Sequence, residues 1–263
     1  MKVRRLSSRA LEKIWGTQET EPWYPRGPGQ TGEVWFSAPE EPRLLVKFIF
    51  TADKLSVQVH PPDSASGPGK TEMWHVLRAA PDARLALGFT RPLNRGEARA
   101  AALSGEIEGL LRWYPALPGD TFFVPAGTVH AIGAGLALCE IQQNSDVTYR
   151  LYDYGRAREL HLDAALEVAD LGCHPGASEP VNLGPRRRLL AECPYFRTES
   201  ISVAGESAYA GGRGPVLLIC LEGDGHMGDE TFAPGEVWVI PVGADAFTIR
   251  PHNAARCLRV VAP

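Results

Sequence analysis

The sequence has 263 residues, of which 44% are hydrophobic and 22% are charged, and its formal net charge is −4. Such a chain is typical of a globular protein with a sizeable core, and it lacks the positive charge that nucleic-acid or anionic-membrane binding requires. No stretch approaches the roughly 20 apolar residues that span a bilayer, the first residues lack the apolar run of a signal peptide, and the five cysteines form no C-x-x-C pair. We therefore expect a cytoplasmic protein with reduced thiols and neither a nucleic-acid nor a membrane partner.

Short apolar segments, punctuated by glycine and proline, dominate the sequence. This pattern predicts many short strands in a sandwich or barrel, and therefore a mainly β fold. In chain order, the predicted strands cover residues 44–50, 55–60, 72–77, 83–89, 120–126, 136–143, 197–203, 215–223, 236–242 and 257–263.

Two segments between the strands have helical composition. The first covers residues 94–114, with Gly105 as a break, and the second covers residues 162–170, with Asp163 in a capping position. A polar, proline-containing stretch over residues 172–188 is the best linker candidate. We therefore predict an N-terminal domain over residues 1–171, which carries the chemistry, and a C-terminal domain over residues 189–263.

The two predicted domains share a repeated motif, G-x5-P-x-G. It occurs in residues 119–130 and again in residues 235–246. The first glycine begins a strand and the Pro-x-Gly ends it in a tight turn. Three residues after the second glycine, the first copy has His130 and the second copy has Ala246, which has no ligating atom. We therefore predict that the first copy carries chemistry and that the second is structural.

A set of nitrogen and oxygen ligands emerges around the first copy. Gln58 and His60 are two residues apart on a predicted strand, so they project to the same side. Glu72 begins the next apolar run, and His130 ends the glycine–proline motif. Each residue alone has an ordinary alternative, such as a strand histidine or a solvated carboxylate. Together they would suit Zn²⁺, but also Fe²⁺, Mn²⁺, Co²⁺ or Ni²⁺.

The motifs resemble a known family. The G-x5-P-x-G-x2-H run that ends at His130 looks like the second motif of the cupin superfamily. LSVQVHPPD, GKTEMWHVL and TYRLYDYGR, together with EKIWG and TGEVW near the start, resemble the type I mannose-6-phosphate isomerases (phosphomannose isomerases) in their short bacterial form. The resemblance covers roughly residues 11–170.

This resemblance implies two jelly-roll barrels, the second without metal. It implies that Gln58, His60, Glu72 and His130 hold zinc, that Arg150 is catalytic and that Lys70 lines the site. The implied reaction interconverts mannose 6-phosphate and fructose 6-phosphate through a cis-enediol, in a monomer or homodimer. For Arg150, the competing interpretation is an ion pair with Asp146 or Asp153.

Several roles stay open at this point. The general base would be Lys70, Glu72 or a metal-bound water, and a nearby dication would lower the pKa of Lys70. The sequence has no P-loop, so the candidate phosphate donors are Lys47, Arg156 and Arg158, each with a surface charge as the ordinary alternative.

The segments around 37–43 and 61–71 are shorter than in relatives. One alternative is therefore an isomerase of another sugar or sugar phosphate. Two further alternatives are a non-catalytic sugar-phosphate-binding cupin and a metal-dependent dioxygenase.

Overall fold

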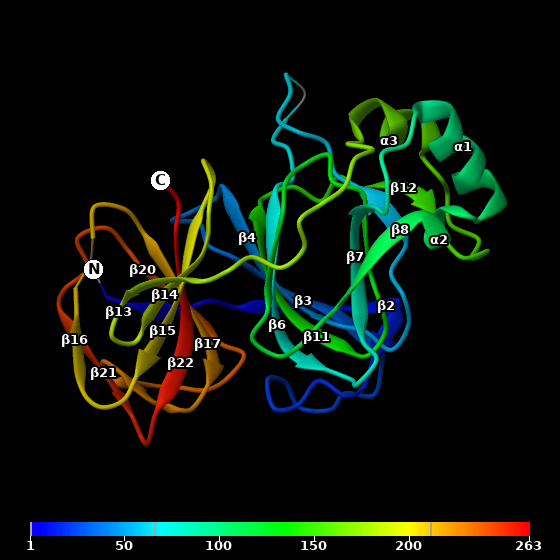
Figure 1. Cartoon of the computed structure of the whole chain (residues 1–263). Helices are drawn as coiled ribbons and strands as arrows, with labels where there is room; N and C mark the ends of the chain where they lie inside the picture. The colour runs from blue at the N-terminus through cyan, green and yellow to red at the C-terminus, as the bar shows by residue number, and fades with distance from the viewer. Residues whose placement is uncertain (1, 66, 211) are drawn as a thin grey trace.

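The computed structural model describes residues 2–65, 67–210 and 212–263. Over these ranges the strands form four sheets, accompanied by three helices (Figure 1). The predicted fold class, mainly β with a few helices, is confirmed. The helices are α1 (Arg95–Ser104), α2 (Ile107–Leu110) and α3 (Leu162–Val168).

The N-terminal part of the chain builds two of the sheets. In spatial order, the six-stranded sheet contains β2 (Ser8–Thr17), β3 (Thr31–Ser37), β4 (Leu44–Phe50), β11 (Leu136–Gln143), β6 (Glu72–Ala79) and β9 (Thr121–Val124). The five-stranded sheet contains β12 (Tyr149–Tyr152), β5 (Val57–Val59), β10 (His130–Ile132), β7 (Arg84–Phe89) and β8 (Leu111–Pro115).

The C-terminal part, joined by β1 from the start of the chain, builds the other two sheets. The seven-stranded sheet contains β1 (Arg4–Arg5), β20 (Val237–Ile240), β17 (Val216–Glu222), β22 (Ala255–Val261), β15 (Arg197–Val203), β14 (Arg187–Glu192) and β13 (Val181–Gly184). The four-stranded sheet contains β16 (Ser207–Tyr209), β21 (Phe247–Pro251), β18 (Gly225–Met227) and β19 (Glu230–Phe232).

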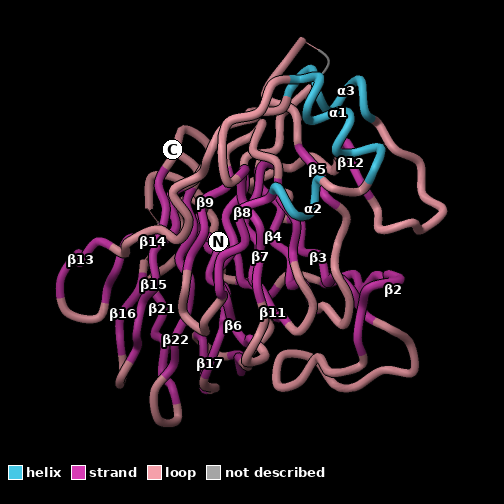
Figure 2. The backbone as a smooth tube through the Cα atoms, turned by 45° about the vertical axis from the view of Figure 1, so that its right-hand side comes forward, coloured by secondary structure: helices cyan, strands magenta, loops and turns pink. Residues whose placement is uncertain are grey.

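The sheets are stacked in layers, and the three helices lie on the outside of the N-terminal half (Figure 2). Side chains such as Ile49 and Leu87 fill the space between the six- and five-stranded sheets. The outer face of the five-stranded sheet packs against the helices through residues such as Ala98 and Leu166. In the C-terminal part, a separate core, which includes Trp238, lies between the seven- and four-stranded sheets.

The two halves meet back to back through one shared core. Phe48 and Phe50 from the six-stranded sheet belong to the same buried cluster as Leu217 and Val239 from the seven-stranded sheet. Because strands alternate their side chains between two faces, and both faces are buried here, β4 and β17 are apolar along almost their whole length. The first residues also join the halves: β1 pairs with β20, and Figure 1 shows the N-terminus among the C-terminal strands.

Two details of the predicted helices are wrong. Residues 111–115 form β8, which pairs with β7, so sheet pairing overrides the helical composition at the end of segment 94–114. The break at Gly105 is confirmed, because this residue ends α1 with a left-handed φ of 84°. Asp163 is not the capping residue of α3: that position is occupied by His161, and Asp163 lies in the first turn, where it pairs with Arg99.

The repeated motif forms the same structure in both halves. Gly119 and Gly235 have left-handed φ values of 96° and 88°, and they lead into β9 and β20.

β13 and the start of β14 lie within residues 172–188, the predicted linker. The longest helix of the described residues, α1, has 10 residues, and no described helix is both long and apolar enough to cross a membrane.

Candidate metal centre

Two neighbouring strands bring a glutamine and a histidine face to face. Gln58 on β5 lies directly opposite His130, the first residue of β10, and their side-chain Nε2 atoms are 3.2 Å apart. His60 follows β5 immediately, and its ring centroid is 4.8 Å from that of His130. The five-stranded sheet and the residue that follows β5 therefore contribute three of the four predicted ligands.

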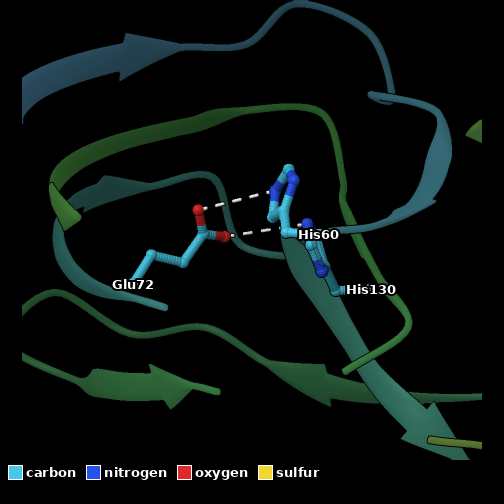
Figure 3. Close-up of side chains that lie close together, drawn as sticks. All are labelled: His60, Glu72 and His130. Atoms are coloured by element: carbon cyan, nitrogen blue, oxygen red, sulfur yellow. Dashed lines mark ion pairs between the residues drawn. The ribbon is translucent and has the colours of Figure 1, made fainter. Parts of the chain in front are cut away.

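Glu72 comes from the opposite sheet, as the first residue of β6. Its Oε2 lies 3.6 Å from Nε2 of His60, and its Oε1 lies 3.6 Å from Nε2 of His130 (Figure 3). One ligand atom from each of the three residues lies within 4.8 Å of the others. The three residues are at most 2% exposed, so these polar groups face one another out of contact with bulk water.

Both imidazoles are held in the form that binds a metal. Nδ1 of His60 lies 2.9 Å from the Val147 carbonyl, and Nδ1 of His130 lies 2.9 Å from the Thr128 carbonyl. A carbonyl only accepts hydrogen bonds, so Nδ1 carries the proton and Nε2 directs its lone pair toward Glu72. Burial lowers the pKa of His130 to about 4 and that of His60 well below its usual value, so both rings are neutral near pH 7.

The carboxylate of Glu72 has an oxygen without a hydrogen-bond partner among the described residues and a raised pKa. Oε1 of Glu72 is buried and has no hydrogen-bond partner among the described residues. Burial raises the pKa of Glu72 to about 7, although the Lys70 ammonium acts in the opposite direction. A cation among the three side chains would satisfy the orphaned oxygen and favour the carboxylate form. The donor set therefore fits a divalent metal.

Gln58 is placed as predicted but turned. Its Nε2 faces His130, while its Oε1 accepts a hydrogen bond from Ser56 Oγ at 3.0 Å. The two ends of an amide are nearly identical in shape, so a rotation of the amide would direct the oxygen to the cluster. Ligation through Gln58 Oε1 requires this rotated state.

Lys70 lies directly beside the cluster, as predicted. Its Nζ is 2.6 Å from Oε2 of Glu72 and 2.9 Å from Nε2 of His60. Burial alone would lower the pKa of Lys70, but the carboxylates of Glu140 and Glu72 outweigh it and raise this pKa. A dication bound beside Lys70 would act in the opposite direction and lower this pKa.

A cavity of about 320 Å³ opens beside the cluster, and Gln58, Lys70 and Arg150 are part of its lining. Lys47 and Glu140 also line it and form an ion pair at 3.0 Å. Lys47 is only 4% exposed, so the surface-charge alternative for this residue is wrong. Sequence reasoning missed Glu140, although a carboxylate inside the apolar run LALCEIQQ was a signal.

Strand register holds Arg150 next to the group formed by His60, Glu72 and His130. It lies opposite Gln58 in the pairing of β12 with β5, and its Nη1 donates to the Glu159 carbonyl at 2.7 Å. Neither Asp146 nor Asp153 pairs with it among the described residues; Asp153 pairs instead with Arg156 and Arg158. The ion-pair alternative for Arg150 is therefore wrong.

Comparisons with known proteins agree with this arrangement. The sequence is 35% identical to mannose-6-phosphate isomerase ManA of Bacillus subtilis, with 82% of this chain and 73% of the relative covered. The chain belongs to the mannose-6-phosphate isomerase family. A second family member, from Streptococcus mutans, is 35% identical over 70% of this chain and 62% of its own length. No family model matches the sequence.

Solved structures of mannose-6-phosphate isomerases share the fold. The Bacillus subtilis enzyme superposes with a TM-score of 0.88 at 26% identity, covering 99% of this chain and 100% of that one. A zinc-bound mannose 6-phosphate isomerase superposes with a TM-score of 0.75 at 16% identity and 99% coverage of both chains, which shows the fold alone. The family predicted from the motifs is confirmed.

Proposed function

We propose that this chain is a zinc-dependent aldose–ketose isomerase that interconverts mannose 6-phosphate and fructose 6-phosphate. The observation that carries the proposal is the buried group of His60, Glu72 and His130, with Lys70 and Arg150 beside it, at a cavity in a member of this family. A zinc-bound family member with the same fold supports zinc as the metal.

The ligands would be Gln58, His60, Glu72 and His130. When bound, zinc would supply Lewis-acid stabilisation of the negative charge that develops on the sugar oxygens. The carbonyls of Val147 and Thr128 keep the imidazoles oriented for this role.

The remaining chemistry belongs to groups of this chain. A proton must move between C2 and C1 of the open-chain sugar, and charge grows on the carbonyl oxygen as the cis-enediol forms. The Arg150 guanidinium is permanently cationic, and in this proposal it would donate to that oxygen. Lys70 Nζ, at the wall of the cavity, is our candidate to carry the proton, and the same groups could assist ring opening.

We assign this chemistry to the domain predicted over residues 1–171, and we place the protein in the cytoplasm as a monomer or homodimer. All five cysteines are free, which agrees with a reducing compartment.

A coupled assay tests the function. Purified zinc-loaded protein is given mannose 6-phosphate, and fructose 6-phosphate is followed. We expect turnover that a chelator removes and zinc restores, and a loss of kcat/KM of at least about 100-fold in His130→Ala, because one side of the metal centre is missing.

His226→Ala is the matched control, because His226 is an exposed histidine of the C-terminal half. It should retain both zinc and full activity. If the parent has bound zinc and still does not convert mannose 6-phosphate, the proposed function is wrong, and other sugar phosphates would be tried next.

A further inference from the structure

Three arginines, Arg150, Arg156 and Arg158, lie near one another beside the predicted metal ligands, and Arg156 also lies 3.5 Å from the carboxylate of Asp53. Arg156 and Arg158 both pair with Asp153, whose side chain is 1% exposed. Arg150 has no carboxylate within ion-pair distance among the described residues. Its pKa is lowered first by burial and then by the positive charge of Arg158. The group therefore carries an excess of positive charge.

The other cations at the cavity already have partners. Lys13 lies 3.0 Å from Glu33, Lys47 lies 3.0 Å from Glu140, and Lys70 lies 2.6 Å from Glu72. Asp146 also lines the cavity, but among the described residues it forms no ion pair with either lining arginine. Arg150, which has no ion-pair partner among the described residues, thus adds positive charge to the part of the cavity wall that it shares with Arg158, and this is where an anion would be most favourable.

Arg158 is held rigidly and still has a free edge. Its Nε donates to Asp153 Oδ2 at 2.7 Å and its Nη2 donates to Asp153 Oδ1 at 2.5 Å. Its Nη1 donates to no described residue, and its side chain lines the cavity at 30% exposure. A guanidinium fixed on one edge by a buried carboxylate loses little freedom when its other edge binds an oxyanion.

Arg156 provides the contrast. It shares Asp153 but is not part of the cavity lining. Its Nη1 donates to the Lys54 carbonyl at 2.8 Å, so its three donor nitrogens are all engaged within the protein. Arg156 therefore has a structural role around Asp153, whereas Arg158 is available to a ligand.

We infer that Arg158, held by Asp153, binds the phosphate group of the substrate. The inference rests on the proposed function, because it takes the substrate to be a hexose 6-phosphate. In the open-chain form of such a sugar, the reacting carbons C1 and C2 and the phosphate lie at opposite ends. Arg150 lies opposite the predicted ligand Gln58, and Arg158 supplies the anion site on the wall of the same cavity.

Steady-state kinetics of Arg158→Gln provide the first test. Losing a charge-assisted hydrogen bond to phosphate should raise KM for mannose 6-phosphate by about 10- to 100-fold and change kcat by less than about threefold. Arg158→Lys should recover part of the affinity, because it restores the charge without the fork. Arg156→Gln is the matched control and should raise KM less than Arg158→Gln does.

A binding measurement separates this inference from the isomerase itself. Inorganic phosphate is titrated calorimetrically into the zinc-loaded parent, Arg158→Gln and Arg156→Gln proteins. We expect the parent to bind and Arg158→Gln to bind at least about tenfold more weakly. The inference is overturned if the parent does not bind phosphate, or if Arg158→Gln matches the parent in phosphate affinity. A parent that binds phosphate through Arg158 without turning over mannose 6-phosphate would refute the function and support the phosphate site.

Discussion

His75 is a buried histidine that the metal centre does not use. It lies on β6, where its Nδ1 is 3.0 Å from Thr121 Oγ, and its Nε2 has no partner among the described residues. Burial, followed by the charge of Arg256, lowers the pKa of His75 to about 4. This histidine is therefore neutral in the folded protein between about pH 4 and the ordinary histidine pKa of about 6.5, where a free histidine is protonated.

His75 should make the protein less stable in mild acid. Between the unfolded pKa, about 6.5, and the folded value, the unfolded chain binds a proton that the folded chain does not, so stability falls as the pH falls. Relative to His75→Gln, the parent should lose about 2 kcal/mol more between pH 7 and pH 5. Urea unfolding of both proteins at both pH values measures this difference.

His60 and His130 titrate in both proteins, so their contribution cancels in the comparison. Equal pH dependence of the two unfolding free energies would show that His75 does not remain neutral in the fold.

The predicted site residues differ in how they could be recognised. Motif spacing predicted that Gln58 and His60 share a side of a strand and that His130 follows the glycine–proline turn, and the family resemblance joined them into one ligand set. In the structure, the pairing of β10 with β5 places His130 opposite Gln58. The pairing of Glu140 with Lys47 depends on the register of β11 against β4, in which the two residues are direct partners. Register between strands far apart in the sequence is set by the whole sheet, and no local pattern reports it.

The segment between His60 and Glu72 shows how one half of the protein positions the other. Oδ1 of Asp63 accepts hydrogen bonds from the Gly69 amide at 2.7 Å and from Gln143 Nε2 at 2.9 Å. Oδ2 of Asp63 accepts one from the Tyr195 hydroxyl at 2.7 Å. Tyr195 lies between β14 and β15, so the C-terminal half fixes the loop that ends in Lys70.

Tyr195→Phe should loosen this loop without disturbing the core. Removing the hydroxyl deletes one hydrogen bond to a carboxylate, and we expect kcat/KM for mannose 6-phosphate to fall about three- to tenfold, because Lys70 is held less well. The measurement is steady-state kinetics, with the thermal midpoint followed in parallel.

Tyr209→Phe is the matched control, because the Tyr209 hydroxyl bonds to Arg259 within the C-terminal half. Kinetics of Tyr195→Phe that match those of this control would show that the tether does not act on the site.

The segment from α1 to β8 shows which element boundaries a local sequence pattern predicts and which it does not. Asn94 and Gly105 bound α1 as their chemistry predicts: Asn94 forms a capping box with Glu97, and Gly105 takes the left-handed conformation. Residues 111–115 leave the helical pattern because an open edge of β7 pairs with them. That edge exists only after the sheet has formed.

At the scale of the whole molecule, the shared core makes the two halves one folding unit. Leu217, 2% exposed, belongs to the cluster that also contains Phe48 and Phe50. Leu217→Ala should therefore destabilise the protein by about 2–5 kcal/mol and still give one unfolding transition. Zinc release and loss of the far-UV β signal should move together in urea.

Leu103→Ala is the control, because Leu103 is 65% exposed. It should leave both signals at the parental midpoint. Two separate transitions in Leu217→Ala, of which only one is shifted, would contradict the single unit.

The repeat predicted two similar halves, but it could not predict how they pack. Strands such as β4 and β17 are apolar on both faces, so their sequences do not tell which face meets the other half. The position of β1 was also beyond prediction, because two residues that pair with a strand more than 200 positions later carry no pattern of their own.

The order of strands in the seven-stranded sheet has a consequence for how the protein is made. β22, the last strand of the chain, lies in the interior of that sheet, between β17 and β15, while β1, the first strand, lies at its edge. A ribosome delivers these pieces from first to last. The interior position of the sheet is therefore filled only after its two neighbours, β17 and β15, have been made, and the core shared with the six-stranded sheet stays incomplete until β22 supplies its side chains.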